Sequence, residues 1–580
     1  MAYSVLIENG VETRLSDGTV LRSTVYRPLA EGERFPVLLT RTPYGRDLSV
    51  NSAYFNPATV AAEGFAVILQ DVRGRFGSDG EFTPSAQEAD DGAETVEWAA
   101  RLPYSSGTVG MWGRSYFAES QWRAARRAPR GLAALAPGVC AAGSADNGAL
   151  FRGGASELGS RLSWGHGSIS LEALRREFAD DPDRLGRESE AWRELDASFA
   201  DGSAYDTLPL NDLKSRASTF MESLIIPSAG GEPGGDASEA WDWPASAPVP
   251  LATLHIGGWF DIFLPNTLGQ YRLQLDAARH DPSVPRPRLI LGPWSHASFT
   301  GLFPDAAFPG GSAAALGPYG DLSSIHAQWF RHTLAGGPEP AVPPVLVYVL
   351  GENRWRGFEE LPEPTGHREL FLGPGGTLGD APGEDASEQY DYDPLDPVPS
   401  TGGATMHLGA DFPGPAEQSA VEARDDVLTF TTEPLAEPLT LFGEVTAHLY
   451  ASSSAVDTDF VVRLCRVTPD GRSMSLTDGI VRASWRDASA HDGVFRAGVP
   501  RRPLTPGAVE EYTVSLWSTA CTFSAGDRLR VQITSSCHPR WDRNLNTGAK
   551  ALDSSDTVVA HQRIHLGAAT PNRITVGVLS

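Results

Sequence analysis

The sequence has few cysteines and few basic residues for its length. Its four cysteines (Cys140, Cys465, Cys521 and Cys537) are scattered along 580 residues and form no C-x-x-C pair. We therefore expect neither a disulfide framework nor a zinc site, and a reducing cytoplasm is the expected compartment. The chain has 47 Lys and Arg against 73 Asp and Glu, a formal net charge of −26. That balance argues against a nucleic-acid partner, because phosphate binding needs clustered basic side chains.

Long apolar runs and cofactor motifs are also missing. No stretch approaches the roughly 20 apolar residues that span a bilayer. The opening MAYSVLIENGVETRLSDG has no basic segment followed by an apolar one, so no membrane anchor and no secretory signal are expected. GGEPGG lacks the Lys and Ser/Thr of a phosphate loop. His561 and His565 form H-x-x-x-H without the glutamate of a zinc protease, so we expect neither metal nor cofactor.

What the first 140 residues do contain is a series of short apolar runs that end in turn or polar residues. Runs of this kind predict buried strands of a mostly parallel sheet: FPVLLTRTPYG, GFAVILQDVRG, GTVGMWGRSYF and LAALAPGVC. SAQEADDGAETVEWAARL between them has helical spacing, with acidic residues where the helix dipole favours them. LATLHIGGWFD and PRLILGPWSHA repeat the strand pattern further on. Alternating strands and helices predict an α/β architecture.

Two other sequence patterns distinguish the rest of the chain. Residues 145–245 read as a helical insertion that returns through a Gly/Pro/Ser-rich loop. After residue 345 the pattern alternates with period two, as in YTVSLWS and DRLRVQI, which indicates half-buried strands of a sandwich or jelly roll. We predict an α/β domain in two parts (1–144 and 246–345), an inserted helical cap (145–245) and a jelly-roll-like β domain (346–580).

Ser115, Asp261 and His296 each follow a predicted strand. They occur in the chain order nucleophile, acid, base that α/β-hydrolases use, with the insertion between the first two. Each has an ordinary alternative: a surface serine, a helix N-cap, a buried histidine bonded to a carbonyl. Together, in order and at strand ends, they favour a Ser-His-Asp triad, in which the histidine takes the serine proton and the carboxylate orients the histidine.

Several longer motifs carry a resemblance to a known family. RTPYG, QDVRGRFGSDGEF, GMWGRSY, GGWFDIF and LGPWSH, then ASSSAVDTDFVVRL, PDGRSMSLTDGIVR and DRNLNTG, resemble the bacterial cocaine-esterase-like serine hydrolases. These are related to the X-Pro dipeptidyl-peptidases and the α-amino-acid ester hydrolases. The resemblance covers nearly the whole chain except the cap. It implies an α/β-hydrolase domain, a helical cap and a jelly-roll-like domain, in agreement with the patterns above.

The resemblance also implies roles for single residues. Ser115 corresponds to the nucleophile, His296 to the general base and Asp261 to its orienting acid. The oxyanion donors correspond to the Tyr44 hydroxyl and the Tyr116 backbone N–H, and two such donors would stabilise charge that develops only in the transition state. Tyr44 could instead be a core tyrosine at a strand end. The family pattern G-x-S-Y-x-G is broken by Ala118 in place of the last glycine, and we expect the turn to tolerate this small side chain.

The substrate pocket of this family is aromatic, which singles out Trp164, Phe260 and Phe263. Aromatic residues are equally common as core fillers, so both interpretations stay open for these three. The cap carries many carboxylates that could hold a substrate ammonium, although charge runs on a helix usually face solvent: Asp180, Asp181, Glu188 and Glu190.

The leading functional hypothesis is a serine hydrolase that cleaves carboxylic esters, and by extension amides, through an acyl-enzyme. The alternative is an X-Pro dipeptidyl-peptidase or α-amino-acid ester hydrolase acting on substrates with a free amino terminus. A third hypothesis is a carbohydrate- or protein-binding module in the β-rich C-terminal part, which fold analogy alone supports weakly. The expected partner is a small-molecule ester or amide, with no nucleic acid and no membrane, and a homodimer is compatible with the sequence.

Overall fold

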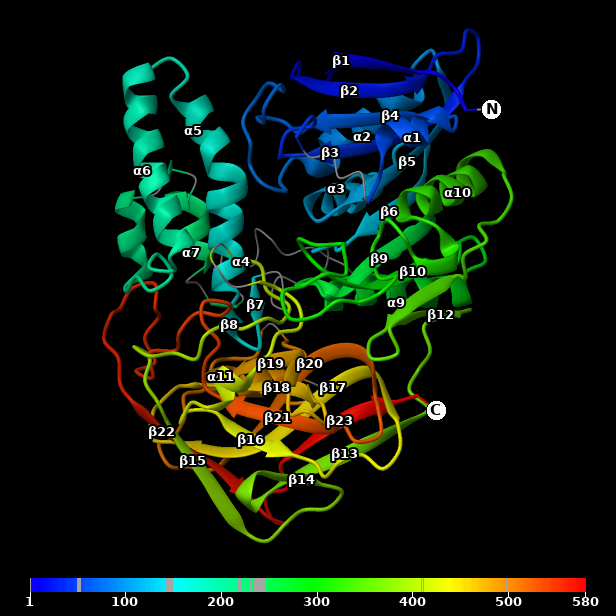
Figure 1. Ribbon diagram of the computed structural model, residues 1–580. Helices are drawn as coiled ribbons and strands as arrows, with labels where there is room; N and C mark the ends of the chain where they lie inside the picture. The colour runs from blue at the N-terminus through cyan, green and yellow to red at the C-terminus, as the bar shows by residue number, and fades with distance from the viewer. Residues whose placement is uncertain are drawn as a thin grey trace.

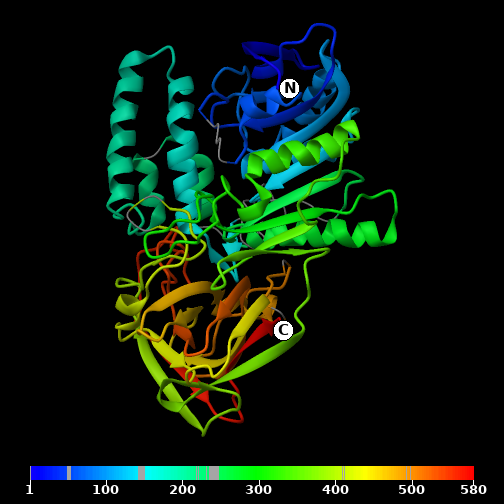
Figure 2. The same ribbon diagram turned by 45° about the vertical axis from the view of Figure 1, so that its right-hand side comes forward.

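The computed structural model describes residues 2–48, 54–141, 150–216, 218–219, 221–229, 232–233, 247–407, 409, 412–491, 493–496 and 498–579. Three parts are visible along the chain: an α/β part, a helical part beside it, and a β-rich part below both (Figure 1). Turning the molecule by 45° keeps the helical part on one side of the α/β part and the β-rich part beneath (Figure 2). The predicted order of fold types is confirmed.

The α/β part is built on one ten-stranded sheet with the order β1-β2-β4-β3-β5-β6-β9-β10-β11-β12. In this order, neighbouring strands from β4 to β11 pair in parallel, and β1, β2 and β12 add antiparallel edges. The strands are β1 Val5–Arg14, β2 Val20–Pro28, β3 Phe35–Thr42, β4 Ala66–Asp71, β5 Ser105–Arg114, β6 Leu132–Gly138, β9 Ala252–Phe260, β10 Arg288–Ser295, β11 Val345–Val349 and β12 Arg354–Phe358.

Helices cover both faces of this sheet, which explains why its central strands are almost wholly apolar. Helices α1 and α10 share a core with one face, and α2 and α3 share a core with the other. Gly336 ends α10 in a left-handed conformation (φ 65°), the usual glycine role at a helix C-terminus. The helices are α1 Pro57–Ala62, α2 Glu88–Ala100, α3 Tyr116–Ala125, α9 Leu264–His280 and α10 Leu322–Ala335.

The helical cap enters and leaves between β6 and β9. A short hairpin, β7 Phe151–Arg152 with β8 Ala155–Ser156, leads into its helices. These are α4 Leu158–Ser163, a π-helical segment Trp164–Ser170, α5 Leu171–Glu177, α6 Pro182–Ala200, a 3-10 segment Leu210–Arg216, a second π-helical segment Met221–Ile225 and α7 Ile226–Ala229. Most of the Gly/Pro/Ser-rich loop, including most of GGEPGG, lies outside the described residues. No helix in the described part of the chain has the length and apolar character to cross a membrane.

The β-rich part is an 11-stranded sheet in which β20 pairs with β17 off the main path. The predicted strand is present, with Tyr512, Val514 and Leu516 of β20 fully buried, although Thr513 between them is buried too, so both faces of the strand are covered there. Its elements are β13 Gly366–Gly373, β14 Thr377–Gly379, β15 Ala386–Tyr392, α11 Ser419–Glu422, β16 Leu428–Thr431, β17 Leu439–Ser453, β18 Asp459–Val467, β19 Ser473–Arg482, β20 Glu510–Phe523, β21 Arg528–Thr534, β22 Ala560–Leu566 and β23 Arg573–Val578.

The boundary expected at residue 345 cuts through the first sheet. Strand β11 begins at Val345 and pairs in parallel with β10, and β12 then pairs with β11. The apolar run VLVYV looks alike at a sheet edge and in a sandwich, so the sequence pattern did not separate the two sheets. We therefore propose a boundary near residue 360.

One hydrophobic core joins the two sheets through α9. Leu268 and Leu275 of α9 belong to the same buried cluster as Leu291 of the first sheet and Phe442 and Leu516 of the second. At its rim, Arg272 of α9 pairs with Glu444 of β17 at 3.1 Å. The α/β and β-rich parts therefore pack as continuous interior rather than as two separately closed domains.

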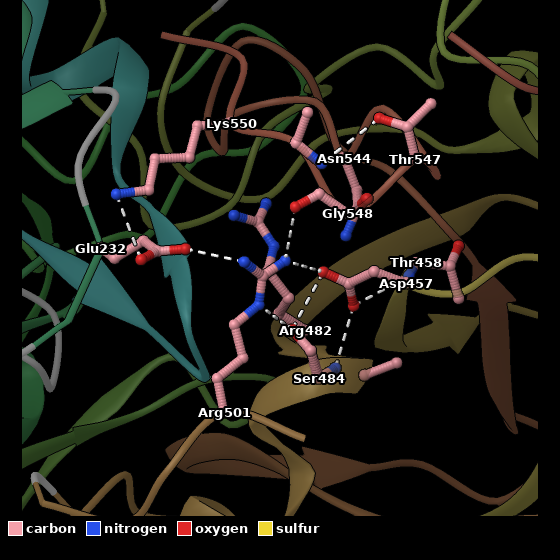
Figure 3. Close-up of polar contacts among 12 residues, drawn as sticks. Glu232, Asp457, Thr458, Arg482, Ser484, Arg501, Asn544, Thr547, Gly548 and Lys550 are labelled. Atoms are coloured by element: carbon pink, nitrogen blue, oxygen red, sulfur yellow. Dashed lines mark hydrogen bonds and ion pairs between the residues drawn. The ribbon is translucent and has the colours of Figure 1, made fainter. Parts of the chain in front are cut away.

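An ionic network connects the cap to the β-rich part at another point (Figure 3). Arg501 pairs with Glu232 of the cap at 2.9 Å and with Asp457 at 2.8 Å. Asp457 is only 2% exposed and also accepts hydrogen bonds from the Ser484 backbone N–H and hydroxyl, both at 2.9 Å. Lys550 lies 3.1 Å from the same Glu232 carboxylate. Asp457 is therefore a buried charge whose cationic partner is Arg501.

Replacing Arg501 by Met should destabilise the protein, because Asp457 would keep its buried charge without that partner. We expect a loss of about 1–3 kcal/mol, below the value for a fully buried pair because the Arg501 side chain is 26% exposed. The control is Arg502→Met, since the Arg502 side chain is 50% exposed in its pairs with Asp487 and Glu510, and it should cost at most about 1 kcal/mol. Equal thermal-unfolding midpoints for the two variants would contradict this assignment.

Candidate active site

Ser115 lies on a sharp turn between β5 and α3. Its backbone has φ 57° and ψ −127°, a conformation that costs energy and is typical of a nucleophile elbow. Gly113 is needed two residues earlier, since a Cβ there would lie 2.5 Å from the Phe117 Cβ. Ala118 is fully buried in the core between α3 and the sheet. The turn is thus formed with alanine in place of the family glycine.

Strand register brings the other two predicted residues beside each other. Phe260, the last residue of β9, pairs with Ser295, the last residue of β10. Asp261 and His296 follow these residues directly, at the same edge of the sheet where β5 delivers Ser115. Asp261 is fully buried and His296 is 7% exposed.

The three side chains form a hydrogen-bonded chain. The Asp261 Oδ1 lies 2.7 Å from His296 Nδ1, and His296 Nε2 lies 2.9 Å from the Ser115 hydroxyl oxygen. Both distances are within the range that proton transfer from a nucleophile to a base requires. The Phe263 ring packs edge-on against the imidazole, with ring centroids 5.0 Å apart, and shields it from water.

The hydroxyl of Tyr44 lies against the serine. It accepts a hydrogen bond of 2.9 Å from the indole N–H of Trp164, and it lines the same cavity as Ser115. Burial raises the pKa of Tyr44 to about 12, although the hydrogen bond from Trp164 and the neighbouring Ser115 act to lower it. The hydroxyl therefore keeps its proton at neutral pH and can donate it. Tyr116, the first residue of α3, places its backbone N–H next to Ser115 at a helix N-terminus, where anions are favoured.

The loop that carries Tyr44 is held by residues of the motif QDVRGRFGSDGEF. Asp71 at the end of β4 accepts the backbone N–H of Arg46 at 2.7 Å and forms an ion pair with its side chain. Arg75, 1% exposed, donates to the Pro43 carbonyl at 2.8 Å and to the Ile169 carbonyl of the cap at 3.1 Å. Sequence reasoning used this motif only as a family signature, and the structure gives it a positioning role.

A cavity opens over Ser115 between the sheet edge and the cap. Two of the three predicted pocket residues, Trp164 and Phe263, line it. Phe260 is not among the described lining residues. It is 1% exposed and packs in the core against Phe303 and Phe308, with ring centroids 5.6 and 6.1 Å away. As the last residue of β9 it turns inward, and of its two interpretations the core one therefore holds.

Sequence reasoning missed several residues that line the same cavity. Ile262 and Met406 add apolar surface, and Glu119 and Arg161 add charge. Glu119 follows the serine by one helical turn, so its place could have been found from helix periodicity. Met406 comes from a loop of the β-rich part and Arg161 from the cap, and no local pattern marks either one.

The cap carboxylates do not line this cavity. Asp180, Asp181 and Glu190 are exposed and Glu188 is half-exposed. Asp181 caps α6 through the Arg184 N–H, and Glu188 and Glu190 form ion pairs with Arg184 and Arg193 on the same helix. His561 and His565 lie far along the chain on β22, bonded to Asp391 and Ser452. Among the described residues, no group of three or more His, Cys, Asp and Glu side chains could hold a metal ion.

Two family models match the chain. One is described as the X-Pro dipeptidyl-peptidase (S15 family) and matches residues 17–298; the other, the X-Pro dipeptidyl-peptidase C-terminal non-catalytic domain, matches residues 340–575. The cocaine esterase of Rhodococcus sp. (strain MB1 Bresler) is 32% identical over 611 aligned residues, with 100% of this chain and 99% of that protein covered.

Two solved structures share the fold over the whole chain. An aminopeptidase from a marine sediment archaeon, Thaumarchaeota archaeon, superimposes with a TM-score of 0.72 at 24% identity, covering 100% of this chain and 97% of that one. An α-amino acid ester hydrolase gives a TM-score of 0.73 at 23% identity with the same coverage. The chain is a hydrolytic enzyme, and it belongs to the cocaine-esterase-like serine hydrolases related to the X-Pro dipeptidyl-peptidases.

Proposed function

We propose that the protein hydrolyses carboxylic esters of small molecules through an acyl-enzyme formed on Ser115. The observation that carries this proposal is the hydrogen-bonded chain from Asp261 through His296 to Ser115, with the Tyr44 hydroxyl against the same serine. The serine esterase activity of the family supports it, and so does the apolar lining of the cavity. We extend the reaction to amides only as a secondary activity.

Each residue has a defined step in this reaction. His296 Nε2 takes the Ser115 proton as the serine oxygen attacks the ester carbonyl, and Asp261 stabilises the imidazolium. The Tyr44 hydroxyl and the Tyr116 backbone N–H donate to the carbonyl oxygen as it becomes an oxyanion. Trp164 is a positioning residue: its N–H occupies a lone pair of the Tyr44 oxygen, which directs the tyrosine proton toward the reaction centre. His296 then protonates the leaving alcohol, and water repeats the sequence on the acyl-enzyme.

The alternative is hydrolysis of substrates with a free amino terminus, as the names of the aminopeptidase and the amino acid ester hydrolase imply for those proteins. It requires an acidic group near the scissile bond. Within the described lining of the cavity the acidic side chain is Glu119, and it already has a cationic partner, Arg123, at 2.7 Å. We therefore rank this alternative second, and we propose a cytoplasmic location from the free, buried cysteines.

Ser115→Ala should abolish turnover and leave the fold unchanged, because alanine occupies the same turn and lacks only the attacking oxygen. A fluorophosphonate should label the wild-type protein on the peptide that contains Ser115 and should not label the variant. Ser120→Ala is the control: Ser120 is buried on the same helix and bonds to a backbone carbonyl, so labelling should persist. Hydrolysis that survives in Ser115→Ala, measured with phenyl acetate, would refute the nucleophile assignment.

Tyr44→Phe should lower kcat by about a hundredfold, the effect of removing one oxyanion donor. Trp164→Phe should lower kcat by about tenfold, because it removes one hydrogen bond that positions the tyrosine and keeps most of the aromatic surface. Trp192→Phe is the matched control in the cap, since its indole N–H bonds to Ser170 instead, and it should leave kcat unchanged. Steady-state kinetics with one ester measures all three, and a larger effect for Trp192→Phe would contradict the positioning role.

A comparison of phenyl acetate, a benzoyl ester and Ala-Pro-4-nitroanilide should separate the two activities. We expect kcat/KM for at least one ester to exceed that for the dipeptide anilide by a hundredfold or more, on the order of the 2.7 kcal/mol that an unmet ammonium partner costs. A preference for Ala-Pro-4-nitroanilide would reverse the ranking of the two proposals.

A further inference from the structure

Two oppositely charged side chains face the cavity from opposite helices. Glu119 lies on α3, one turn after Ser115, and Arg161 lies on α4, one turn before Trp164. Both line the cavity together with the titratable His296. Both are almost fully buried, with Glu119 5% and Arg161 6% exposed. A substrate bound over Ser115 would therefore meet both charges with little intervening water.

The charge of Glu119 is already matched within the protein. Its carboxylate accepts a short hydrogen bond from the Ser85 hydroxyl and forms an ion pair with Arg123 at 2.7 Å, one turn along the same helix. A substrate ammonium would have to compete with Arg123, a cation fixed in place by helix geometry. Glu119 is thus poorly suited to recognise a positive group.

Arg161 is placed to reach a substrate beside the reacting atoms. It is three residues before Trp164, so the two side chains share one helix face, and its guanidinium lies 5.8 Å from the indole ring centroid. That indole N–H bonds to Tyr44, which lines the same cavity as Ser115. Burial lowers the pKa of Arg161 to about 9 and nearby Glu119 raises it, so the group is a cation at neutral pH.

Two more arginines, the buried Arg75 and the half-buried Arg114, lie near the site and donate to neutral acceptors. Arg75 bonds to the Pro43 and Ile169 carbonyls, and Arg114 bonds to the His296 carbonyl at 3.2 Å. Carbonyl oxygens satisfy hydrogen bonds without cancelling charge. Glu172 offsets Arg75, and Asp261 offsets Arg114, only at longer range. These arginines add to a positive potential at the site of a protein whose overall charge is −26.

We infer that the active site selects esters that carry a carboxylate near the scissile bond, and that Arg161 is the residue that recognises it. This inference rests on the proposed ester hydrolysis at Ser115 and names its substrate class. The guanidinium presents parallel N–H donors that match the two oxygens of a carboxylate, and charge-assisted bonds of this kind are roughly twice as strong as neutral ones. The apolar residues Phe263 and Met406 would contact the remainder of the substrate.

The test uses two series of esters that differ only in charge. The first places the group on the alcohol: phenyl acetate, 4-acetoxybenzoate and 4-(aminomethyl)phenyl acetate. The second places it on the acyl part: methyl benzoate, monomethyl terephthalate and methyl 4-(aminomethyl)benzoate. In at least one series, kcat/KM for the carboxylate should exceed that for the ammonium analogue by about tenfold or more, the size of one charge-assisted hydrogen bond. No preference for the carboxylate in either series would overturn the inference.

Variants of Arg161 assign the preference to this residue. Arg161→Gln should reduce the carboxylate-to-neutral ratio of kcat/KM by about tenfold. Arg161→Lys should retain part of the preference. Arg175→Gln, which removes the same charge from an exposed position on α5, should leave the ratio unchanged. An unchanged ratio in Arg161→Gln would refute the role of Arg161.

Two further measurements decide the outcome if the variant fails to fold or if the protein is not an esterase. If Arg161→Gln does not fold, competitive inhibition of the wild-type protein decides: benzoate should inhibit at a lower concentration than benzylamine, and equal inhibition would overturn the inference. A failure of the proposed function looks different. It would appear as no hydrolysis of any of the six esters and no fluorophosphonate labelling of Ser115, whereas failure of this inference alone leaves both intact and only the charge preference absent.

Discussion

The backbone conformation of Ser115 is the constraint on which the site depends. A positive φ at a non-glycine residue is unfavourable, and it persists because the turn is fixed on both sides. On one side β5 lies in the middle of a parallel sheet, and on the other α3 packs on that sheet through Ala118 and Trp122. The folding energy of the α/β part therefore offsets the strain, and the serine is held at the sheet edge where His296 and Tyr44 also arrive.

The features that could be predicted from the sequence are those that repeat or that mark the ends of strands. Apolar runs located the central strands, and the chain order of Ser115, Asp261 and His296 placed three side chains at one sheet edge. Parallel sheets make this inference possible, because strands that run the same way bring their carboxyl ends together. The family signature supplied Tyr44, which no periodicity would have indicated.

The features that could not be predicted depend on which way a side chain turns after a strand ends. Phe260 and Phe263 are three residues apart, yet one packs in the core and the other faces His296, since the chain bends sharply between them. Arg161 and Met406 reach the cavity from the cap and from the β-rich part. Their positions follow from packing between distant segments. The local sequence around a residue does not predict such packing. Strand β11 was assigned to the wrong part for a different reason, because an apolar run such as VLVYV is typical both of a sheet edge and of a sandwich.

The apolar face of α9 bears on how this architecture can change over evolutionary time. Leu268 and Leu275 are buried by side chains of both sheets at once. Each part alone would therefore expose apolar side chains where the two parts meet. A chain cut near residue 360 would leave each piece with a broad exposed apolar surface, prone to aggregate. Recombination that replaced one part with an unrelated module would meet the same obstacle. The catalytic part and its β-rich companion are therefore expected to be inherited, and to melt, as one cooperative unit.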